Sequence, residues 1–235
     1  MLVLKRKYLL SLFLAAVLWI TCSWGYLGMY AGDASLATLA PVSRGSSDQA
    51  RVSLMFNVDW GEEYIPEILD ILKSKGVKAT FFLTGAWVEK NSDLAKRIVS
   101  EGHEVGNHGQ VHAHIEDMSK ERLQDLILKG EETIFEFTGA RPSKLFAPPY
   151  GEWNDSTVSY ASEIGYQTIL WTVDTVDWRN PPPETIWKRA LSGAVPGALI
   201  LLHPTEPTVE ALPVIIDGLK EKGLLAVTVS ENLGP

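Results

Sequence analysis

The sequence repeats one pattern: a short apolar, β-rich run is followed by an amphipathic helical segment, and this pair recurs along the chain. Strands joined by helices form parallel sheets, because parallel neighbours need a long crossover connection. The pattern predicts strands over 52–59, 79–84, 105–108, 145–147, 168–173, 198–202 and 225–229. Helices are predicted over 65–74, 92–100, 119–137, 155–164, 184–191 and 209–222.

Seven strands with six intervening helices fit either an open doubly wound sheet or a barrel. Polar residues stand at the C-terminal ends of at least five predicted strands. Barrel enzymes build their sites from many strand ends, whereas an open sheet gathers its site at one switch point. The sequence therefore predicts an α/β fold in which about seven parallel strands form a barrel.

The N-terminal segment from Tyr8 to Tyr30 is mostly apolar and carries no charge. As a helix it would span roughly 35 Å, enough for a hydrocarbon core of about 30 Å. Three cations at positions 5–7 precede it, which predicts a cytoplasmic N-terminus and an extracytoplasmic domain. The alternative is a cleaved signal peptide and a secreted protein. We expect a cytoplasmic tail at 1–7, a transmembrane signal anchor at 8–30, a linker at 31–50 and one domain at 51–235.

Charge and cysteine content exclude nucleic-acid binders and proteins stabilised by internal disulfides. The net charge of -8 argues against a nucleic-acid binder, which needs a basic surface to neutralise phosphates. Cys22 is the only cysteine, so no disulfide can form within the chain. We expect no nucleic-acid partner and a monomeric protein.

Two predicted strand ends carry residues that can bind a metal. Asn57 and Asp59 point to the same side of their strand because side chains alternate. His108 and His112, four residues apart on a turn of helix, can reach one cation. Together with Asp59 they form the two-histidine, one-carboxylate set of a divalent metal site, most simply zinc. Alternatively, the two histidines cap a loop and bind backbone carbonyls.

Three further strand ends carry a rigid turn, an acid beside an aromatic, and a histidine. Pro148-Pro149-Tyr150-Gly151 follows the fourth strand, and a purely structural turn explains it equally well. The next end reads Asp174-Thr175-Val176-Asp177-Trp178. His203 follows an apolar strand, and a lone histidine in such a place is usually structural. Its position at the same barrel face as the metal candidates favours a role in the site.

These residues form a set that resembles the polysaccharide deacetylase (NodB-homology, carbohydrate esterase family 4) domain. The resemblance covers residues 52–233 and includes variant first and third motifs. The sequence is also similar to membrane-anchored members of this family from Gram-positive, spore-forming bacteria. The motifs that carry it are 65–69 with 76–82, Gly102 to His108 with His112, Pro148 to Gly151, Asp177-Trp178 and Leu202-His203.

The resemblance implies a distorted (β/α) barrel that removes N-acetyl, or sometimes O-acetyl, groups from peptidoglycan or chitin-like glycans. It also implies a divalent metal, usually zinc, held by an aspartate and two histidines. Its residues would match as follows: metal ligands Asp59, His108 and His112; substrate-binding residues Pro148, Pro149, Tyr150, Gly151, Trp178 and Leu202; general acid His203, oriented by Asp177.

The sequence departs from the family pattern at the catalytic base. The usual first motif is Thr-Phe-Asp-Asp-Gly, whose first aspartate is the base and whose second binds the metal. Here Asn57 occupies the base position, and the ligand is Asp59 if alternation decides. If the motif is read without a gap, Val58 falls at the ligand position and only the histidines are left to bind the metal. The family arginine that pairs with the base is Ala147. A carboxylate borrowed from Glu62 or Glu63 could replace the base.

Two functions follow from the resemblance. The first is a membrane-anchored, metal-dependent hydrolase that deacetylates a cell-envelope glycan, with an altered base at Asn57. The second is a degenerate family member that binds glycan or acts as a scaffold without turnover. Retention of Asp59, His112 and His203 favours the enzyme, and the changes at Asn57 and Ala147 favour the second function.

Overall fold

The computed structural model describes residues 40–234, so the predicted tail 1–7 and membrane span 8–30 lie outside the described residues. Within the described part, no helix has the length and apolar character needed to cross a bilayer. The compact unit begins at Ala40. Val42 donates its N–H to the carbonyl of Thr168 at 2.8 Å, and Gly45 donates to that of Gly197 at 2.7 Å. The described end of the expected linker is therefore hydrogen-bonded to the domain.

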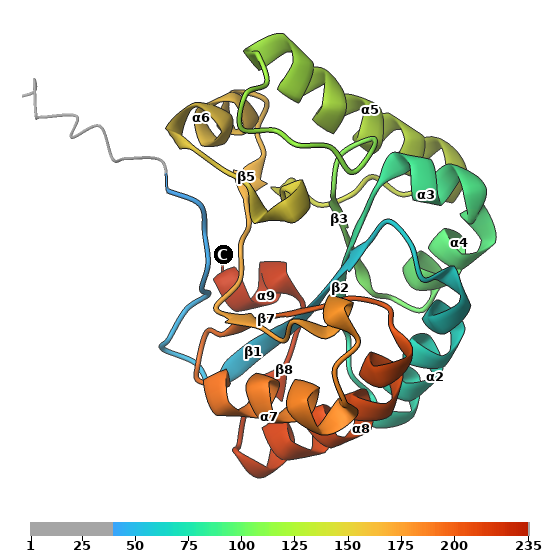
Figure 1. Ribbon diagram of the computed structural model, residues 1–235, viewed down its shortest axis with the longest axis vertical. Coiled ribbons are helices and arrows are strands. Elements are labelled where there is room, and N and C mark those ends of the chain that lie inside the picture. The colour runs from blue at the N-terminus through green and yellow to red at the C-terminus, as the bar shows by residue number, and fades with distance from the viewer. Residues whose placement is uncertain (1–39, 235) are drawn as a thin grey trace, which may run out of the picture. The chain divides into compact units, whose positions relative to one another are not determined.

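All strand pairings of the central sheet are parallel, as the alternation of strands and helices predicts (Figure 1). The strand order is β5-β4-β3-β2-β1-β7-β6, and β8 pairs with the first residues of β1. The strands are β1 (Arg51–Val58), β2 (Thr80–Leu83), β3 (Glu104–Asn107), β4 (Leu145–Phe146), β5 (Gln167–Thr168), β6 (Val173–Asp174), β7 (Leu199–Leu202) and β8 (Leu225–Ala226).

The sheet curls into an incomplete barrel, which fits the distorted (β/α) barrel expected from the sequence. The predicted strand at 168–173 is wrong as a single element: it forms two short strands, β5 and β6, at opposite ends of the strand order. Between them, Ile169 pairs with Val42 of the N-terminal segment. Arg44 pairs with Ala198 on the other side of this gap. The segment before β1 therefore contacts both sides of the open seam.

Helices surround the curled sheet (Figure 1), and neighbouring helices pack in pairs such as α7 with α8, α2 with α8 and α5 with α6. The pattern correctly predicts six of them, while the short helices α3 and α9 were not predicted. Their bounds are α2 (Ile65–Lys75), α3 (Gly85–Lys90), α4 (Ser92–Ser100), α5 (Lys120–Thr138), α6 (Asp155–Glu163), α7 (Pro183–Gly193), α8 (Glu206–Glu221) and α9 (Val229–Leu233).

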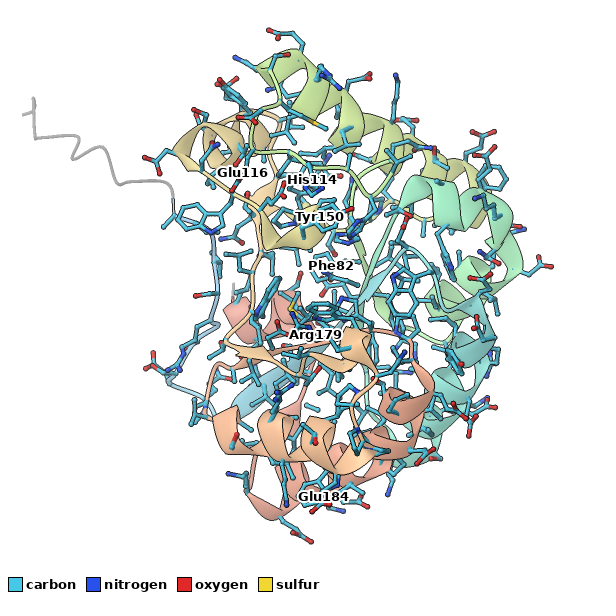
Figure 2. The ribbon with its side chains drawn as sticks, in the orientation of Figure 1. Phe82, His114, Glu116, Tyr150, Arg179 and Glu184 are labelled. Carbon is cyan, nitrogen blue, oxygen red and sulfur yellow. The ribbon has the colours of Figure 1, made fainter. Side chains whose placement is uncertain are left out.

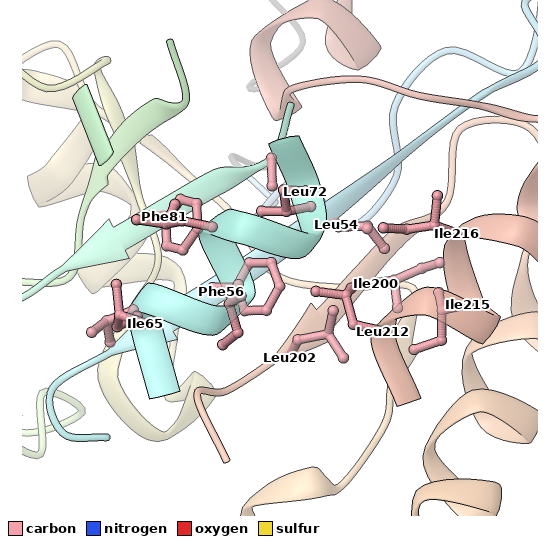
Figure 3. Packing of buried hydrophobic residues seen from close by; sticks show 14 of the residues in the cluster. Leu54, Phe56, Ile65, Leu72, Phe81, Ile200, Leu202, Leu212, Ile215 and Ile216 are labelled. Carbon is pink, nitrogen blue, oxygen red and sulfur yellow. The ribbon is translucent and has the colours of Figure 1, made fainter. Parts of the chain in front are cut away.

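The alternation of β1 builds a separate hydrophobic cluster on each face of the sheet. Leu54 and Phe56 pack outward against the helices, with Ile65 of α2 and Leu212 of α8 in the same cluster (Figure 3). Met55 belongs to a second cluster inside the barrel, together with Val229 of α9. The inner cluster fills part of the barrel and leaves the C-terminal ends of the strands to form a site.

Glu131 of α5 is a buried carboxylate, only 5% exposed, that ties the helix to the sheet. Its oxygens accept hydrogen bonds from the Tyr166 hydroxyl at 2.8 Å and from Lys144 Nζ at 2.6 Å. Asn107, at the end of β3, donates in turn to the Tyr166 hydroxyl at 3.3 Å. Burial raises the pKa of Glu131, but the hydrogen bonds from Lys144 and Tyr166 outweigh it, so the pKa lies below its ordinary value.

We expect Glu131→Ala to lower the free energy of unfolding by about 1–3 kcal/mol, because it leaves the hydroxyl of the buried Tyr166 without its acceptor and removes the ion pair with Lys144. Glu132→Ala is the matched control, since Glu132 is a neighbouring, exposed carboxylate on the same helix. Because the pKa of Glu131 is lowered on folding, its stabilisation is present at neutral pH and is lost as the pH falls below about 4. Urea unfolding at pH 7 and pH 3.5 measures the loss of stability and its dependence on pH. Equal free energies of unfolding for the two variants at pH 7 would contradict the prediction.

Candidate active site

The C-terminal ends of the strands enclose a cavity of about 540 Å³. It is the size of a small-molecule pocket and combines aromatic walls with a few polar groups, the usual character of a binding site. Its lining residues come from the ends of β1, β3, β6 and β7 and from the loops after β3, β4, β5 and β6. They are Asn57, Asp59, Trp60, His108, His112, Tyr150, Gly151, Trp171, Asp174, Trp178, Leu201 and His203.

The end of β1 places Asn57 and Asp59 in this cavity. Val58 lies between them, is fully buried and packs with the outer cluster, so it has no access to the cavity. Thr84 Oγ1, at the end of β2, donates to Asp59 Oδ1 at 2.8 Å and fixes that carboxylate. Asn57 is 6% exposed, and its Oδ1 has no hydrogen-bond partner among the described residues. The alternation of β1 therefore places a neutral amide and a carboxylate side by side.

His108 begins the turn after β3 and is almost completely buried. Its Nδ1 lies 2.6 Å from the carbonyl oxygen of Ala147, so a neutral ring donates from Nδ1 and keeps the lone pair of Nε2 free. Burial lowers the pKa of His108 to about 3 despite this carbonyl. Asn107 stabilises the turn, because its Oδ1 accepts the N–H of Gly109 at 2.7 Å. The ring is thus held neutral, as a metal ligand must be.

His112 faces the same cavity from the next part of the loop. Its ring centroid lies 5.1 Å from that of His108 and 4.3 Å from that of Tyr150. Burial lowers the pKa of His112, and the nearby Asp59 carboxylate opposes this shift. Tyr150 is held on its other side by His114, which stacks on it at 4.1 Å (Figure 2). His112 and Tyr150 form one wall of the cavity, and His114 supports Tyr150 without lining the cavity.

Glu152 joins the histidine loop to the turn that carries Tyr150. Its carboxylate lies 2.5 Å from His114 Nδ1 and accepts the N–H of Ile115 at 2.9 Å. Tyr150 itself has a left-handed backbone, with φ of 59°. Gly151 follows with φ of 69°, and a Cβ there would lie 2.4 Å from the ring of Trp171. Glycine is therefore required where this turn packs against the opposite wall.

His203 lies on the other side of the cavity, directly after β7. Its Nδ1 is 2.8 Å from Asp177 Oδ1, and its backbone N–H donates to Asp177 Oδ2 at 2.6 Å. Asp177 is fully buried and also accepts the Thr208 hydroxyl at 2.7 Å. With Nδ1 engaged, Nε2 is the ring nitrogen free for proton transfer. Trp60 stacks parallel to the ring, with 6.1 Å between centroids.

The donors Asp59, His108 and His112 have the chemistry of a zinc site: one carboxylate and two neutral imidazoles. All three line the cavity, and His108 has the hydrogen-bonded Nδ1 that is typical of metal-binding histidines. Across residues 40–234, however, no three histidine, cysteine or acidic side chains are already gathered closely enough to hold an ion. The residue types fit a metal, and their side chains would have to close around it.

Several sequence-predicted site residues lie elsewhere. The prediction that Leu202 lines the acetyl pocket is wrong. Leu202 is fully buried on the outer face with Phe56, its partner in β1, and Leu201 lines the cavity instead. The predicted inner face of β7 is therefore displaced by one residue. Pro148 and Pro149 shape the turn but do not line the cavity. Glu62 and Glu63, the possible borrowed bases, are exposed in η1 (Glu62–Tyr64) outside it.

The cavity contains four residues to which sequence reasoning gave no role: Trp60, Trp171, Asp174 and Leu201. Trp60 and Asp174 stand at predicted strand ends beside residues that were assigned roles, so a systematic reading of those ends could have included them. Trp171 lies inside what was predicted as one strand. No sequence signal shows that the chain leaves the sheet there and turns this ring toward the cavity.

Solved structures support the architecture. The chain matches the crystal structure of a CE4 family pseudoenzyme from Bacillus anthracis with a TM-score of 0.80 and 42% identity, covering 83% of this chain and 69% of that one. A mutant described as having restored enzymatic activity matches at 40% identity with the same score. A peptidoglycan N-acetylglucosamine deacetylase structure with a bound N-hydroxybenzamide compound matches with a TM-score of 0.79 and 37% identity, covering 84% of this chain and 94% of that one.

Curated relatives give the same family. An uncharacterised protein of Bacillus subtilis is 42% identical over 191 residues, which are 81% of this chain and 60% of that protein. The chain thus spans less than two thirds of that relative's length. A peptidoglycan-N-acetylglucosamine deacetylase of Bacillus cereus is 38% identical over 190 residues, covering 79% of this chain and 69% of the relative. The polysaccharide deacetylase family model matches residues 44–169. This chain therefore belongs to the polysaccharide deacetylase family.

Proposed function

We propose that this protein is a metal-dependent deacetylase that removes N-acetyl groups, and in some substrates O-acetyl groups, from a cell-envelope glycan such as peptidoglycan. The observation that carries the proposal is the pairing of His203 with the buried Asp177 across one cavity from Asp59, His108 and His112. The proposed proton donor and the proposed metal ligands thus line the same cavity. The peptidoglycan deacetylases among the relatives support the substrate class.

The reaction requires an activated water, stabilisation of the developing oxyanion and a proton for the leaving amine. A zinc ion at Asp59, His108 and His112 would polarise the acetyl carbonyl and lower the pKa of a bound water to about 7. His203 would give its Nε2 proton to the leaving nitrogen, since Asp177 holds the opposite side of the ring. Trp178 and Leu201 provide apolar surface in the cavity against which the acetyl methyl can pack.

The second candidate is a glycan-binding protein without turnover. It is favoured by Asn57, a neutral amide where the family base stands, and by the similarity to a CE4 family pseudoenzyme. In this case the cavity would still accept an acetylated sugar through its aromatic walls. Acetate release distinguishes the two functions, because both predict glycan binding and only the first predicts acetate.

We further propose that residues 8–30 anchor the protein in the cell membrane, with the domain outside and residues 1–7 in the cytoplasm. The uncharged segment and the preceding cations support this arrangement. It places the cavity on the side of the membrane where envelope glycans lie. A monomer suffices for the proposed reaction, since one chain supplies every residue named for it.

The metal ligands are tested by removal of single histidines. His108→Ala and His112→Ala should abolish stoichiometric zinc binding, because two remaining ligands form a poor site. Asp59→Ala should weaken zinc binding by about tenfold or more. His114→Ala is the matched control, since this exposed histidine does not line the cavity. Metal analysis and calorimetric titration check the result, and unchanged affinity in His108→Ala would refute the assignment.

The enzyme function is tested by acetate release from acetylated peptidoglycan and chitooligosaccharides. The zinc-loaded protein should release acetate, and His203→Ala should lower kcat by about 10²- to 10⁴-fold without loss of metal. Asp177→Asn should also lower kcat, because the ring loses the carboxylate that orients it. Glycan binding without acetate release by the wild-type protein would instead favour the second candidate.

The membrane anchor is tested by fractionation of cells. The full-mass protein should sediment with membranes and be released by detergent, and external protease should cut ahead of the hydrogen-bonded segment that begins at Val42. Because residues 8–43 contain no lysine or arginine, the protease is the broadly specific proteinase K, and the expected product is a resistant domain of matching mass in the supernatant. A soluble mature protein that begins after residue 30 would show that the signal is cleaved.

A further inference from the structure

Asp174 supplies the cavity with a second carboxylate besides Asp59. It is the last residue of β6, and its Oδ1 accepts the N–H of Val176 at 2.8 Å. Among the described residues, no lysine, arginine or histidine forms an ion pair with it. Its charge is therefore not committed to a structural ion pair and remains available inside the cavity.

The sheet register places Asp174 on the same face as Asn57. Asp174 pairs with Leu201 of β7, and Leu201 pairs with Met55 of β1. Paired residues of parallel strands share a face, and Asn57 is two residues beyond Met55 on that face. The two side chains thus face the interior from strands about two strand spacings, or roughly 10 Å, apart. The cavity lies between them, so a substrate could contact both.

The backbone after Asp174 is held in an unfavourable conformation. Val176 has φ of 56° and Asn180 has φ of 50°, and a β-branched residue such as Val176 rarely adopts the left-handed region. The turn is fixed by Thr175, whose hydroxyl donates to the Leu201 carbonyl at 2.8 Å and whose own carbonyl accepts Arg189 Nη1 at 3.0 Å. Such strain is typical of functional sites. Here it fixes Asp174 and Asp177, one facing the cavity and one holding His203.

The other carboxylates near the cavity are already engaged. Asp177 is fully buried and accepts three hydrogen bonds, two from His203 and one from Thr208. Asp59 accepts the Thr84 hydroxyl and is the proposed metal ligand. Glu62 is exposed and does not line the cavity. Among the described residues, Asp174 is the carboxylate that lines the cavity without an ion pair, without contact to His203 and without a proposed metal role.

We propose that Asp174 acts as the general base in place of the aspartate that Asn57 replaces. This inference rests on the proposed deacetylase function. Asp174 takes a proton from water while the water oxygen bonds to the acetyl carbonyl carbon. His203 then gives a proton to the sugar nitrogen as the carbon–nitrogen bond breaks, which yields acetic acid and the free amine. The proton on Asp174 returns through solvent to His203, so the cycle closes without another reactant.

The test is a double-mutant cycle on the zinc-loaded, full-length protein, with acetate release from an acetylated chitooligosaccharide as the readout. The variants are Asp174→Asn, Asn57→Asp and the two combined, and Glu62→Gln is the control for loss of a carboxylate outside the cavity. Asp174→Asn alone should lower kcat by about 10²- to 10⁴-fold with little change in KM. In the Asn57→Asp background, which restores a carboxylate at the family position, Asp174→Asn should lower kcat by less than about tenfold. A mutant of the similar pseudoenzyme with restored activity indicates that this fold can regain turnover.

Each outcome separates the inference from the function on which it rests. An equal loss from Asp174→Asn in both backgrounds would assign Asp174 a structural role and overturn the inference. Full activity of Asp174→Asn would overturn it as well, while the deacetylase function would stand. If the Asn57→Asp variants release acetate and the wild type releases none, the deacetylase function of the natural chain is overturned. The role of Asp174 as its base is then overturned as well. Glycan binding measured by calorimetry confirms that each variant still forms the cavity.

Discussion

Alternate side chains of β1 face opposite sides of the sheet, and both the fold and the cavity depend on this alternation. Leu54, Phe56 and Val58 face the helices and pack in the outer cluster. Asn57 and Asp59 face the interior at the strand end. Because β1 also pairs with β2, β7 and β8, a slip of one residue would exchange the two faces and break three strand pairings at once. The position of the first site residues is therefore as well determined as the core.

A backbone carbonyl positions one of the proposed metal ligands. The carbonyl oxygen of Ala147 lies 2.6 Å from His108 Nδ1. This contact does not depend on the side chain at position 147. In the family pattern that the sequence resembles, an arginine at position 147 pairs with an aspartate at position 57. Replacement of both together, by Ala147 and Asn57, is physically coherent because a buried unpaired cation is costly. The contact that positions His108 is independent of this pair.

The sequence was sufficient where periodicity and burial act locally. It predicts the parallel sheet, six helices and the strand ends that bring Asp59, His108, His112 and His203 to one cavity. It failed where tertiary contacts decide: the break between β5 and β6 depends on pairing with Val42 and cannot be recognised in a short apolar run. Leu202 was misplaced because a four-residue apolar strand gives no polar marker of its inner face. Asp174 was visible at a strand end, but only the three-dimensional structure shows that no cation within residues 40–234 forms an ion pair with it.

The central claim is that Asp59, His108 and His112 close around one divalent ion in this cavity. X-ray absorption spectroscopy at the zinc edge of the zinc-loaded, full-length protein tests it most directly. We expect a coordination shell with two imidazole nitrogens at about 2.0–2.1 Å and oxygen ligands, and loss of this zinc signal in His112→Ala once unbound metal is removed. A shell of oxygen atoms without imidazole, or a spectrum unchanged in His112→Ala, would contradict it.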